Sequence, residues 1–282
     1  MNHGWQLTED VEEFLTAAGA FLEADALAHT VLLSVSEAVR LHGPFTFDGT
    51  APARFGHRTA ADGTVVAAFV RTPPRAVLLS TMDDESARSL AALLPDVPGA
   101  TGPAAVARAF ADATGRPWRV HRNERLFRLT ELTEPGPTPA GRARPATAAD
   151  VPLVAAWLAD FAAFIGERPV RDWTAQAERR VASGRLLLWE TDGRPVSMVG
   201  WTPPLAGHIR IAPVYTPPRD RARGYAGAAV HAACRQLDTE LLLFTDLANP
   251  TSNALYHRVG FRPLADHTEL IFPAQPPRGA RL

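Results

Sequence analysis

Two short blocks in the second half of the chain combine residue types that can bind an anion and move a proton. The first block is Arg221-Ala-Arg-Gly-Tyr-Ala226, which follows an apolar run and the pair Pro217-Pro218. An extended segment, a tight glycine-bearing turn and a helix start would direct free backbone N–H groups and the positive end of a helix dipole to one point. Gly224 allows a phosphate to approach the backbone closely. Arg221 and Arg223 add positive charge beside this loop.

The second block runs from Asn249 to Phe261 and reads Asn-Pro-Thr-Ser-Asn-Ala-Leu-Tyr-His-Arg-Val-Gly-Phe. Its first residue is suited to cap a helix, and the proline after it suits the first turn. Asn253 and Tyr256 are three residues apart, so they share one face of that helix. Gly260 ends the helix, and a strand follows.

The hydrophobic periodicity predicts the elements that must position these blocks. Helices are expected over residues 9–21 (capped by Thr8), 24–41, 83–94, 104–114, 147–164, 173–182, 224–237 and 252–259. Strands are expected over residues 54–58, 65–71, 76–80, 186–190, 196–202, 209–216 and 241–245. Residues 118–132 are expected to form one long or two short strands, and a closing pair of strands is expected up to Phe272.

The two halves of the chain repeat one pattern at a constant spacing. Asp62-Gly63 with Thr72-Pro73-Pro74 recurs 130 residues later as Asp192-Gly193 with Thr202-Pro203-Pro204. The equal order of elements favours two copies of one fold over a chance match between common turns. We expect a first domain over 1–132, a Pro- and Gly-rich linker over 133–144, a second domain over 145–272 and a loose tail over 273–282.

The two blocks, in this order and at this spacing, resemble the GNAT superfamily of acyl-CoA N-acyltransferases over about Arg142 to Phe272. The resemblance implies an α+β class with two GNAT-like domains. Each would be a mixed, mostly antiparallel twisted sheet flanked by helices. It also implies acetyl-CoA as the co-substrate and direct attack of an amine on the thioester, without a covalent enzyme intermediate.

The resemblance also implies roles for residues of the second half. The loop from Arg221 to Ala226 would hold the pyrophosphate through its main-chain N–H groups. The backbone at Val214 and Thr216 would pair with the pantetheine arm and the acyl carbonyl, and Tyr256 would be the general acid for the leaving thiolate. The full set of implied donor-binding residues is Val214, Tyr215, Thr216, Arg221, Ala222, Arg223, Gly224, Tyr225, Ala226, Asn249, Ser252, Asn253 and Tyr256.

The base that takes the proton of the amine is not fixed by the sequence. Four side chains are candidates, and each has a plain structural alternative, such as a solvated helix end or a turn. They are His208, Glu167, Glu190 and Asp246.

The first half lacks an equivalent loop. Asp83-Asp84-Glu85 follows its strand over 76–80, and three carboxylates would repel a pyrophosphate. The first half is therefore expected to be a degenerate GNAT-like domain without a cofactor site. The alternative is an unrelated α+β domain that only supports the second half.

Composition excludes several other classes of function. The net charge of −1 gives no support to a nucleic-acid partner, and all 29 basic residues are arginine, so no lysine can act as a nucleophile. Cys234 is the single cysteine, and the nine histidines show no metal-ligand spacing, so no disulfide and no metal are expected. No apolar run is long enough for a membrane span. We expect a cytoplasmic monomer or homodimer.

The sequence thus predicts an N-acetyltransferase that transfers an acetyl group from acetyl-CoA to an amine of a small molecule or a peptide N-terminus. Two alternatives stay open. One is transfer of a longer acyl group, and the other is a non-catalytic module that binds or senses acyl-CoA.

Overall fold

The computed structural model describes residues 4–46, 51–134, 136–167 and 172–273. The chain forms two compact units. Unit 1 comprises residues 1–125, 246–248 and 265–282, and unit 2 comprises residues 126–245 and 249–264. Each unit contains segments from both of the domain ranges expected from the sequence, 1–132 and 145–272. Those two ranges therefore stay a prediction. The tail expected over 273–282 lies outside the described residues from position 274 onward.

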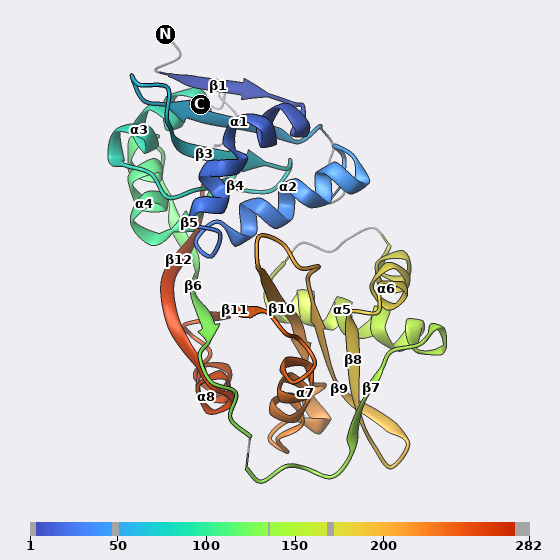
Figure 1. Cartoon of the computed structure of the whole chain (residues 1–282). Helices are drawn as coiled ribbons and strands as arrows, with labels where there is room; N and C mark the ends of the chain where they lie inside the picture. Colours follow the sequence, from blue (N-terminus) through green and yellow to red (C-terminus); the bar gives the residue numbers. More distant parts are fainter. Residues whose placement is uncertain (1–3, 47–50, 135, 168–171, 274–282) are drawn as a thin grey trace, which may run out of the picture. The chain divides into compact units, whose positions relative to one another are not determined.

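The two halves of the chain have the same order of helices and strands (Figure 1). The first half consists of β1 (Trp5–Thr8), α1 (Val11–Ala24), α2 (Thr30–His42), β2 (Arg54–Thr59), β3 (Val65–Arg71), β4 (Val77–Leu79), α3 (Asp84–Leu93), β5 (Gly99–Pro103), α4 (Ala104–Ala113) and β6 (Arg119–Leu129). The second half consists of β7 (Arg142–Pro145), η1 (Ala148–Asp150), α5 (Val151–Phe164), α6 (Trp173–Ala182), β8 (Leu186–Thr191), β9 (Arg194–Trp201), β10 (His208–Tyr215), η2 (Pro218–Asp220), α7 (Tyr225–Cys234), β11 (Glu240–Asp246), α8 (Pro250–Val259) and β12 (Phe261–Ile271).

Strand pairing follows the same scheme in both halves. Consecutive strands pair antiparallel from β1 to β4 in the first half and from β7 to β10 in the second half. The next pair is parallel in each half: β4 pairs with β5, and β10 pairs with β11. The last strands are exchanged. His267–Ile271 of β12 pairs with β5, whereas β6 stands next to β11 in the strand order. Each half of the sequence therefore supplies a strand that completes the sheet of the other half.

Both faces of the sheet in unit 2 are covered by helices. Side chains alternate between the faces of a strand, and in β8 the residues Leu186 and Leu188 pack in the cluster of α5 and α6. Leu187 and Trp189 of the same strand pack in the cluster of α7 and α8. A strand with two buried faces explains the continuous apolar run that the sequence shows here.

A bulge in β10 changes which face its last side chains occupy. Ala212 and Pro213 together stand opposite one residue of β9, because the register passes from Ile211↔Trp201 to Val214↔Val199. Ile211 and Val214 both pack towards α7 and α8. Tyr215 consequently packs towards α5.

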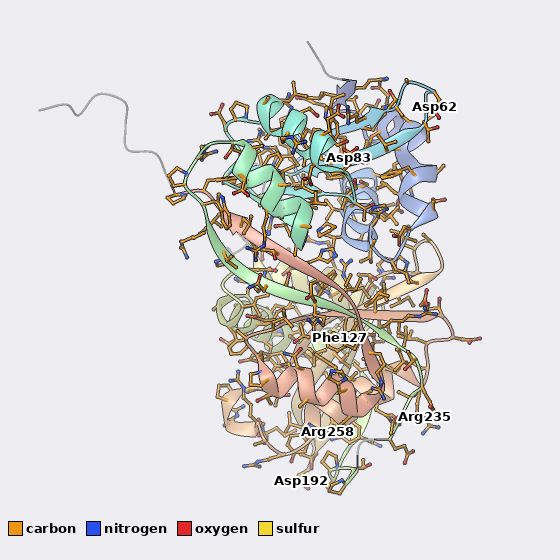
Figure 2. All side chains as sticks on the ribbon, turned by 90° about the vertical axis from the view of Figure 1, so that its left-hand side faces the viewer. Asp62, Asp83, Phe127, Asp192, Arg235 and Arg258 are labelled. Atoms are coloured by element: carbon orange, nitrogen blue, oxygen red, sulfur yellow. The ribbon has the colours of Figure 1, made fainter. Side chains whose placement is uncertain are left out.

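The turns of the repeated hairpins, which contain Asp62 and Asp192, occur where the sequence predicts them (Figure 2). Other details differ from the expected elements. The closing pair of strands expected up to Phe272 is the single strand β12. The cap of α1 is Asp10, whose carboxylate accepts from two backbone N–H groups, while Thr8 ends β1. Residues 142–144 of the expected linker belong to β7. The strands β1 and β5 were missed because four- and five-residue strands carry little periodic signal.

Candidate functional site: a splayed strand pair and its loop

The strands β10 and β11 are paired only at their beginnings. Their parallel pairing covers His208 to Arg210 of β10 and ends at Leu242 of β11. Both strands continue beyond that point, and β10 remains paired with β9 up to Tyr215. The second half of β10 therefore has one edge that faces away from β9 and is not paired with β11.

The loop after β10 has the backbone conformation of an anion cradle. Ala222 and Gly224 both have positive φ, 59° and 83°, and Gly224 is the N-cap of α7. Alternation between left- and right-handed residues turns successive N–H groups to one side. The first helical hydrogen bond of α7 runs from Ala228 N to Gly224 O, so the preceding N–H groups point out of the helix end. A glycine cap adds no side chain to occupy them.

A buried ion pair fixes this loop to the sheet. Asp220, the last residue of η2, is 2% exposed, and both its carboxylate oxygens accept from Arg194 at 2.8 and 2.9 Å. These hydrogen bonds lower the pKa of Asp220. Arg194 is the first residue of β9, so the loop is tied to the strand that pairs with β10.

The second sequence block forms α8 as predicted. Asn249 caps the helix, since its side-chain oxygen accepts from Ser252 N at 3.1 Å, and Gly260 ends it in the left-handed conformation. Asn253 donates from its side chain to the backbone oxygen of Asn249 at 2.8 Å. The cap role of Asn249 is confirmed, and its contact with the donor stays a prediction.

The side chain of Tyr256 lies in the core between α7 and α8 and is 8% exposed. Burial raises the pKa of this phenol, with a smaller contribution from Cys234. Tyr256 is therefore protonated at neutral pH, which is the form that a general acid needs. Cys234 is also buried, and burial raises the pKa of its thiol to about 12, so it is a core residue.

The remaining implied residues line the end of β10 and the loop. Thr216 is bonded on two sides: its hydroxyl lies 2.9 Å from Ser197 Oγ, and its carbonyl accepts from Arg221 Nε at 3.0 Å. Val214 is half-buried on the α7 face. Ala222, Arg223 and Gly224 are exposed. The structure thus brings the predicted donor residues into one unit, and their contacts with a ligand stay predictions.

Three of the four candidate bases have structural roles elsewhere. His208 is buried at the start of β10, seven residues before Tyr215, or about 23 Å along a strand. Glu190 is ion-paired with Arg144 at 2.6 Å. Asp246 accepts from Ala248 N and holds a turn.

A carboxylate that the sequence pattern did not single out lies near the end of β10. Asp160 of α5 accepts a hydrogen bond from the hydroxyl of Tyr215 at 3.2 Å. The centroid of the Tyr215 ring lies 6.1 Å from that of the Trp157 ring. Burial, and to a smaller extent the negative charge of Asp160, raises the pKa of Tyr215. The sequence signal was weak because an isolated aspartate on a helix is usually solvated.

The equivalent helix start in unit 1 is closed by a side chain. Asp83, labelled in Figure 2, caps α3 and accepts from Ser86 N at 2.7 Å. Glu85, in the first turn of α3, forms an ion pair with Arg58 of β2. A carboxylate therefore stands at the start of α3, whereas the glycine cap of α7 makes no side-chain hydrogen bond.

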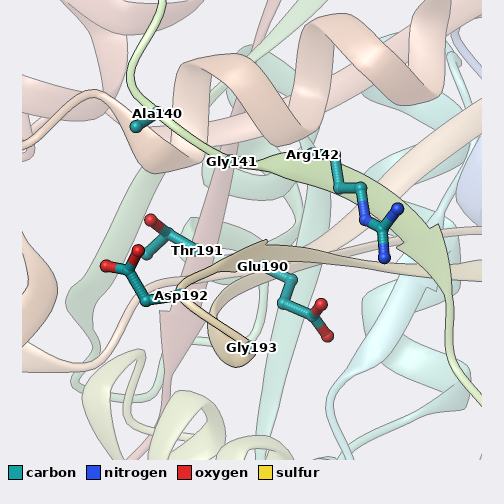
Figure 3. Close-up of a pocket in the computed structure, with 7 residues that line it drawn as sticks. All are labelled: Ala140, Gly141, Arg142, Glu190, Thr191, Asp192 and Gly193. Atoms are coloured by element: carbon teal, nitrogen blue, oxygen red, sulfur yellow. The ribbon is translucent and has the colours of Figure 1, made fainter.

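A shallow hollow of about 420 Å³ lies beside the β8–β9 turn (Figure 3). It is lined by Ala140, Gly141, Arg142, Glu190, Thr191, Asp192 and Gly193. Two of these side chains are carboxylates, which disfavours a phosphate, and none of the lining residues belongs to β10 or its loop. We therefore locate the candidate site at the splayed strands and not in this hollow.

The described residues contain no group of three or more His, Cys, Asp or Glu side chains that could hold a metal ion. Within the same residues, no helix is long and apolar enough to cross a membrane.

Solved structures define the class of fold. A GCN5-related N-acetyltransferase from Sphaerobacter thermophilus matches with a TM-score of 0.61 and 19% identity over 96% of this chain and 97% of that chain. A GNAT-family acetyltransferase from Colwellia psychrerythraea matches with a TM-score of 0.56 and 14% identity over 95% and 98%. A tandem GNAT protein from the clavulanic acid biosynthesis pathway matches with a TM-score of 0.57 and 11% identity over 94% and 97%. The chain therefore has the GNAT fold over nearly its whole length.

A family model matches part of the sequence. Residues 152–261 match the model of the acetyltransferase (GNAT) family, so the sequence similarity to that family covers this part of the chain. The match begins in α5 and ends at the first residue of β12. A search of curated protein sequences found no match.

Proposed function

We propose that this protein is an N-acetyltransferase that uses acetyl-CoA as donor and an amine of a small molecule or a peptide N-terminus as acceptor. The observation that carries the proposal is the unpaired edge of β10, which leads directly into the left-handed loop at Ala222 and Gly224. An extended ligand arm with amide groups can pair with such an edge, and a phosphate fits the N–H groups of such a loop.

The loop and the strand edge would share the work of binding the donor. The N–H groups around Gly224 would hold the pyrophosphate, with Arg223 as an additional charge. Val214 and Thr216 would bind the pantetheine arm through their backbone. Arg221 now donates to the Thr216 carbonyl, so this arginine would exchange that hydrogen bond when the donor binds. Anchoring a large donor at many points places its thioester for attack.

Protein groups on both sides of the gap between β10 and β11 would stabilise the charges that develop on the thioester oxygen and sulfur. A backbone N–H of the β10 edge would donate to the thioester oxygen as it gains negative charge. Tyr256 would donate its proton to the sulfur as the C–S bond breaks and would regain a proton from the acylated nitrogen. Its raised pKa keeps that proton in place before the reaction.

The acceptor must lose a proton before its nitrogen can attack. An ammonium group would give one proton to Asp160, the carboxylate bonded to Tyr215, and its nitrogen would then form the C–N bond to the acetyl carbon. The net products are the acetylated amine, the free thiol and one proton released from Asp160 to solvent.

The first half would support this site without binding a donor of its own, because Asp83 occupies the helix start that a phosphate would need. A cytoplasmic location and a monomeric or dimeric state stay predictions from the sequence. The same holds for the absence of nucleic-acid and membrane partners.

Release of thiol from acetyl-CoA, measured against a panel of amines, tests the proposal. An acetyltransferase releases thiol only when an acceptor is present. In Tyr256→Phe we expect kcat to fall about 10- to 100-fold, within the range typical of general acid–base catalysis, with the affinity for CoA unchanged. A protein that binds CoA with normal affinity but releases no thiol with any amine would instead be a binding or sensing module.

A further inference from the structure

Beside the end of β10, helix α5 presents an exposed carboxylate and an exposed ring. Asp160 is exposed, and its oxygen holds the buried Tyr215 hydroxyl. Phe164 lies one helical turn further along α5 and is 58% exposed. Arg221 lies over this ring, with its guanidinium carbon 5.0 Å from the centroid. The Phe164 ring already receives a cation on its face, so a carboxylate and a cation-binding ring lie next to each other here.

A second charge reaches the same strand from α6. Arg180 donates to the Ala212 carbonyl, in the β10 bulge, at 3.5 Å. Its side chain is half-buried, and among the residues that the structure describes it forms no ion pair. Burial lowers its pKa, Glu167 partly offsets this, and Arg185 and Arg179 add positive charge around it. Removing a guanidinium from water without a carboxylate partner is unfavourable, and an anionic ligand would relieve that cost.

The two charges flank the unpaired part of β10. Ala212 and Tyr215 are three residues apart on β10, at most about 10 Å along the strand because the bulge lies between them. The stretch between them contains Val214, whose backbone would bind the donor under the proposed function. An acceptor positioned for attack would therefore have a carboxylate on one side and a guanidinium on the other.

We propose that the acceptor is an amine that also carries an anionic oxygen group, such as the carboxylate of an amino acid. Asp160 binds its ammonium group, and Arg180 binds its anionic group. This assignment of a substrate class rests on the proposed function. It makes Arg180 a specificity-determining residue, since an amine without the anionic group leaves the guanidinium unpaired.

Matched pairs of amines that differ only in the carboxylate test this assignment. Suitable pairs are phenylalanine with phenethylamine, tyrosine with tyramine, and 4-aminobutyrate with propylamine. In the wild type we expect at least one carboxylated member to have a kcat/KM about tenfold or more above its partner, because an unpaired buried polar group is penalised strongly. Equal or lower values for the carboxylated member in every pair would overturn the assignment.

Arg180→Gln should lower the kcat/KM of the carboxylated amine to the value of the amine without the carboxylate. The kcat/KM of the amine without the carboxylate and the KM for acetyl-CoA should stay unchanged. Arg180→Lys should restore part of the preference, which a purely structural role would not predict. Arg179→Gln is the control, since this residue is exposed on the same helix. An equal loss for both members of a pair in Arg180→Gln would contradict the assignment.

Binding separates a failure of this inference from a failure of the proposed function. Binding of the same amines to the wild type and to Arg180→Gln is measured by calorimetry with CoA present. Binding of a carboxylated amine that Arg180→Gln removes supports the subsite, even if no thiol is released and the proposed function fails. If amines are acetylated but none of the carboxylated ones binds better than its partner, the proposed function stands and this inference fails.

Discussion

Arg194 and Asp220 join the start of β9 to the loop that follows β10. The two hydrogen bonds, 2.8 and 2.9 Å long, lie on an aspartate that is 2% exposed, whereas the side chain of Arg194 is 48% exposed. Because Arg221 directly follows Asp220, this pair sets where the anion cradle begins. The pair therefore positions the loop without touching a donor itself.

Breaking this pair should weaken donor binding. In Arg194→Gln we expect the KM for acetyl-CoA to rise about tenfold, with kcat at saturation unchanged, since the residue only positions the loop. We also expect the unfolding free energy to fall modestly, because Asp220 loses its hydrogen-bond partner while solvent screens the exposed guanidinium. Steady-state kinetics and urea unfolding measure the two effects. Arg219→Gln is the control, because its side chain is 71% exposed and its contact is 3.4 Å.

Gly224→Glu should abolish CoA binding in calorimetry. The residue has a φ of 83°, which strains any L side chain by about 1–2 kcal/mol, and the new carboxylate would repel a phosphate. Gly207→Glu is a matched control, with a φ of 81° and no atom within 4 Å of an added Cβ. Unchanged affinity for CoA in Gly224→Glu would remove the loop from the proposed site.

His267 should make the protein less stable in mild acid. The residue is 6% exposed, and burial lowers its pKa to about 4, with an opposite contribution from Asp266. Between pH 6.5 and 4 the unfolded chain binds a proton that the folded chain does not. The unfolding free energy therefore decreases as the pH is lowered through this range, by up to about 3 kcal/mol. Urea unfolding at several pH values should show a smaller fall in His267→Gln. The exposed His42→Gln should behave like the wild type.

The strand exchange predicts that the halves of the chain depend on each other. Residues 1–132 alone would leave β5 without β12, its antiparallel partner, and residues 133–282 alone would leave β11 without β6. Unpaired strand edges aggregate, so we expect neither piece to be soluble when expressed alone and both to purify together when co-expressed. Cooperative thermal unfolding of either piece by itself would argue against this dependence.

Most elements of the fold follow from the sequence pattern, because helix caps, turns and apolar periodicity are local. The expected strand Val65–Arg71 and the cap at Asn249 were correct for that reason. The cap at Asp10 was missed because Thr8 carries the same local signal two residues earlier. The short strand β5 was missed because its place depends on a partner far away in the chain.

The sequence alone determined the loop around Gly224, the α8 block and the order of elements that repeats in the two halves. Each of these is encoded within a few consecutive residues. Only the tertiary structure decided that Tyr215 meets Asp160, that Arg180 reaches the β10 bulge and that the last strands are exchanged. The contact between Tyr215 and Asp160 depends on strand register. The one extra residue in the β10 bulge turns the Tyr215 side chain to the α5 face of the sheet, where Asp160 lies.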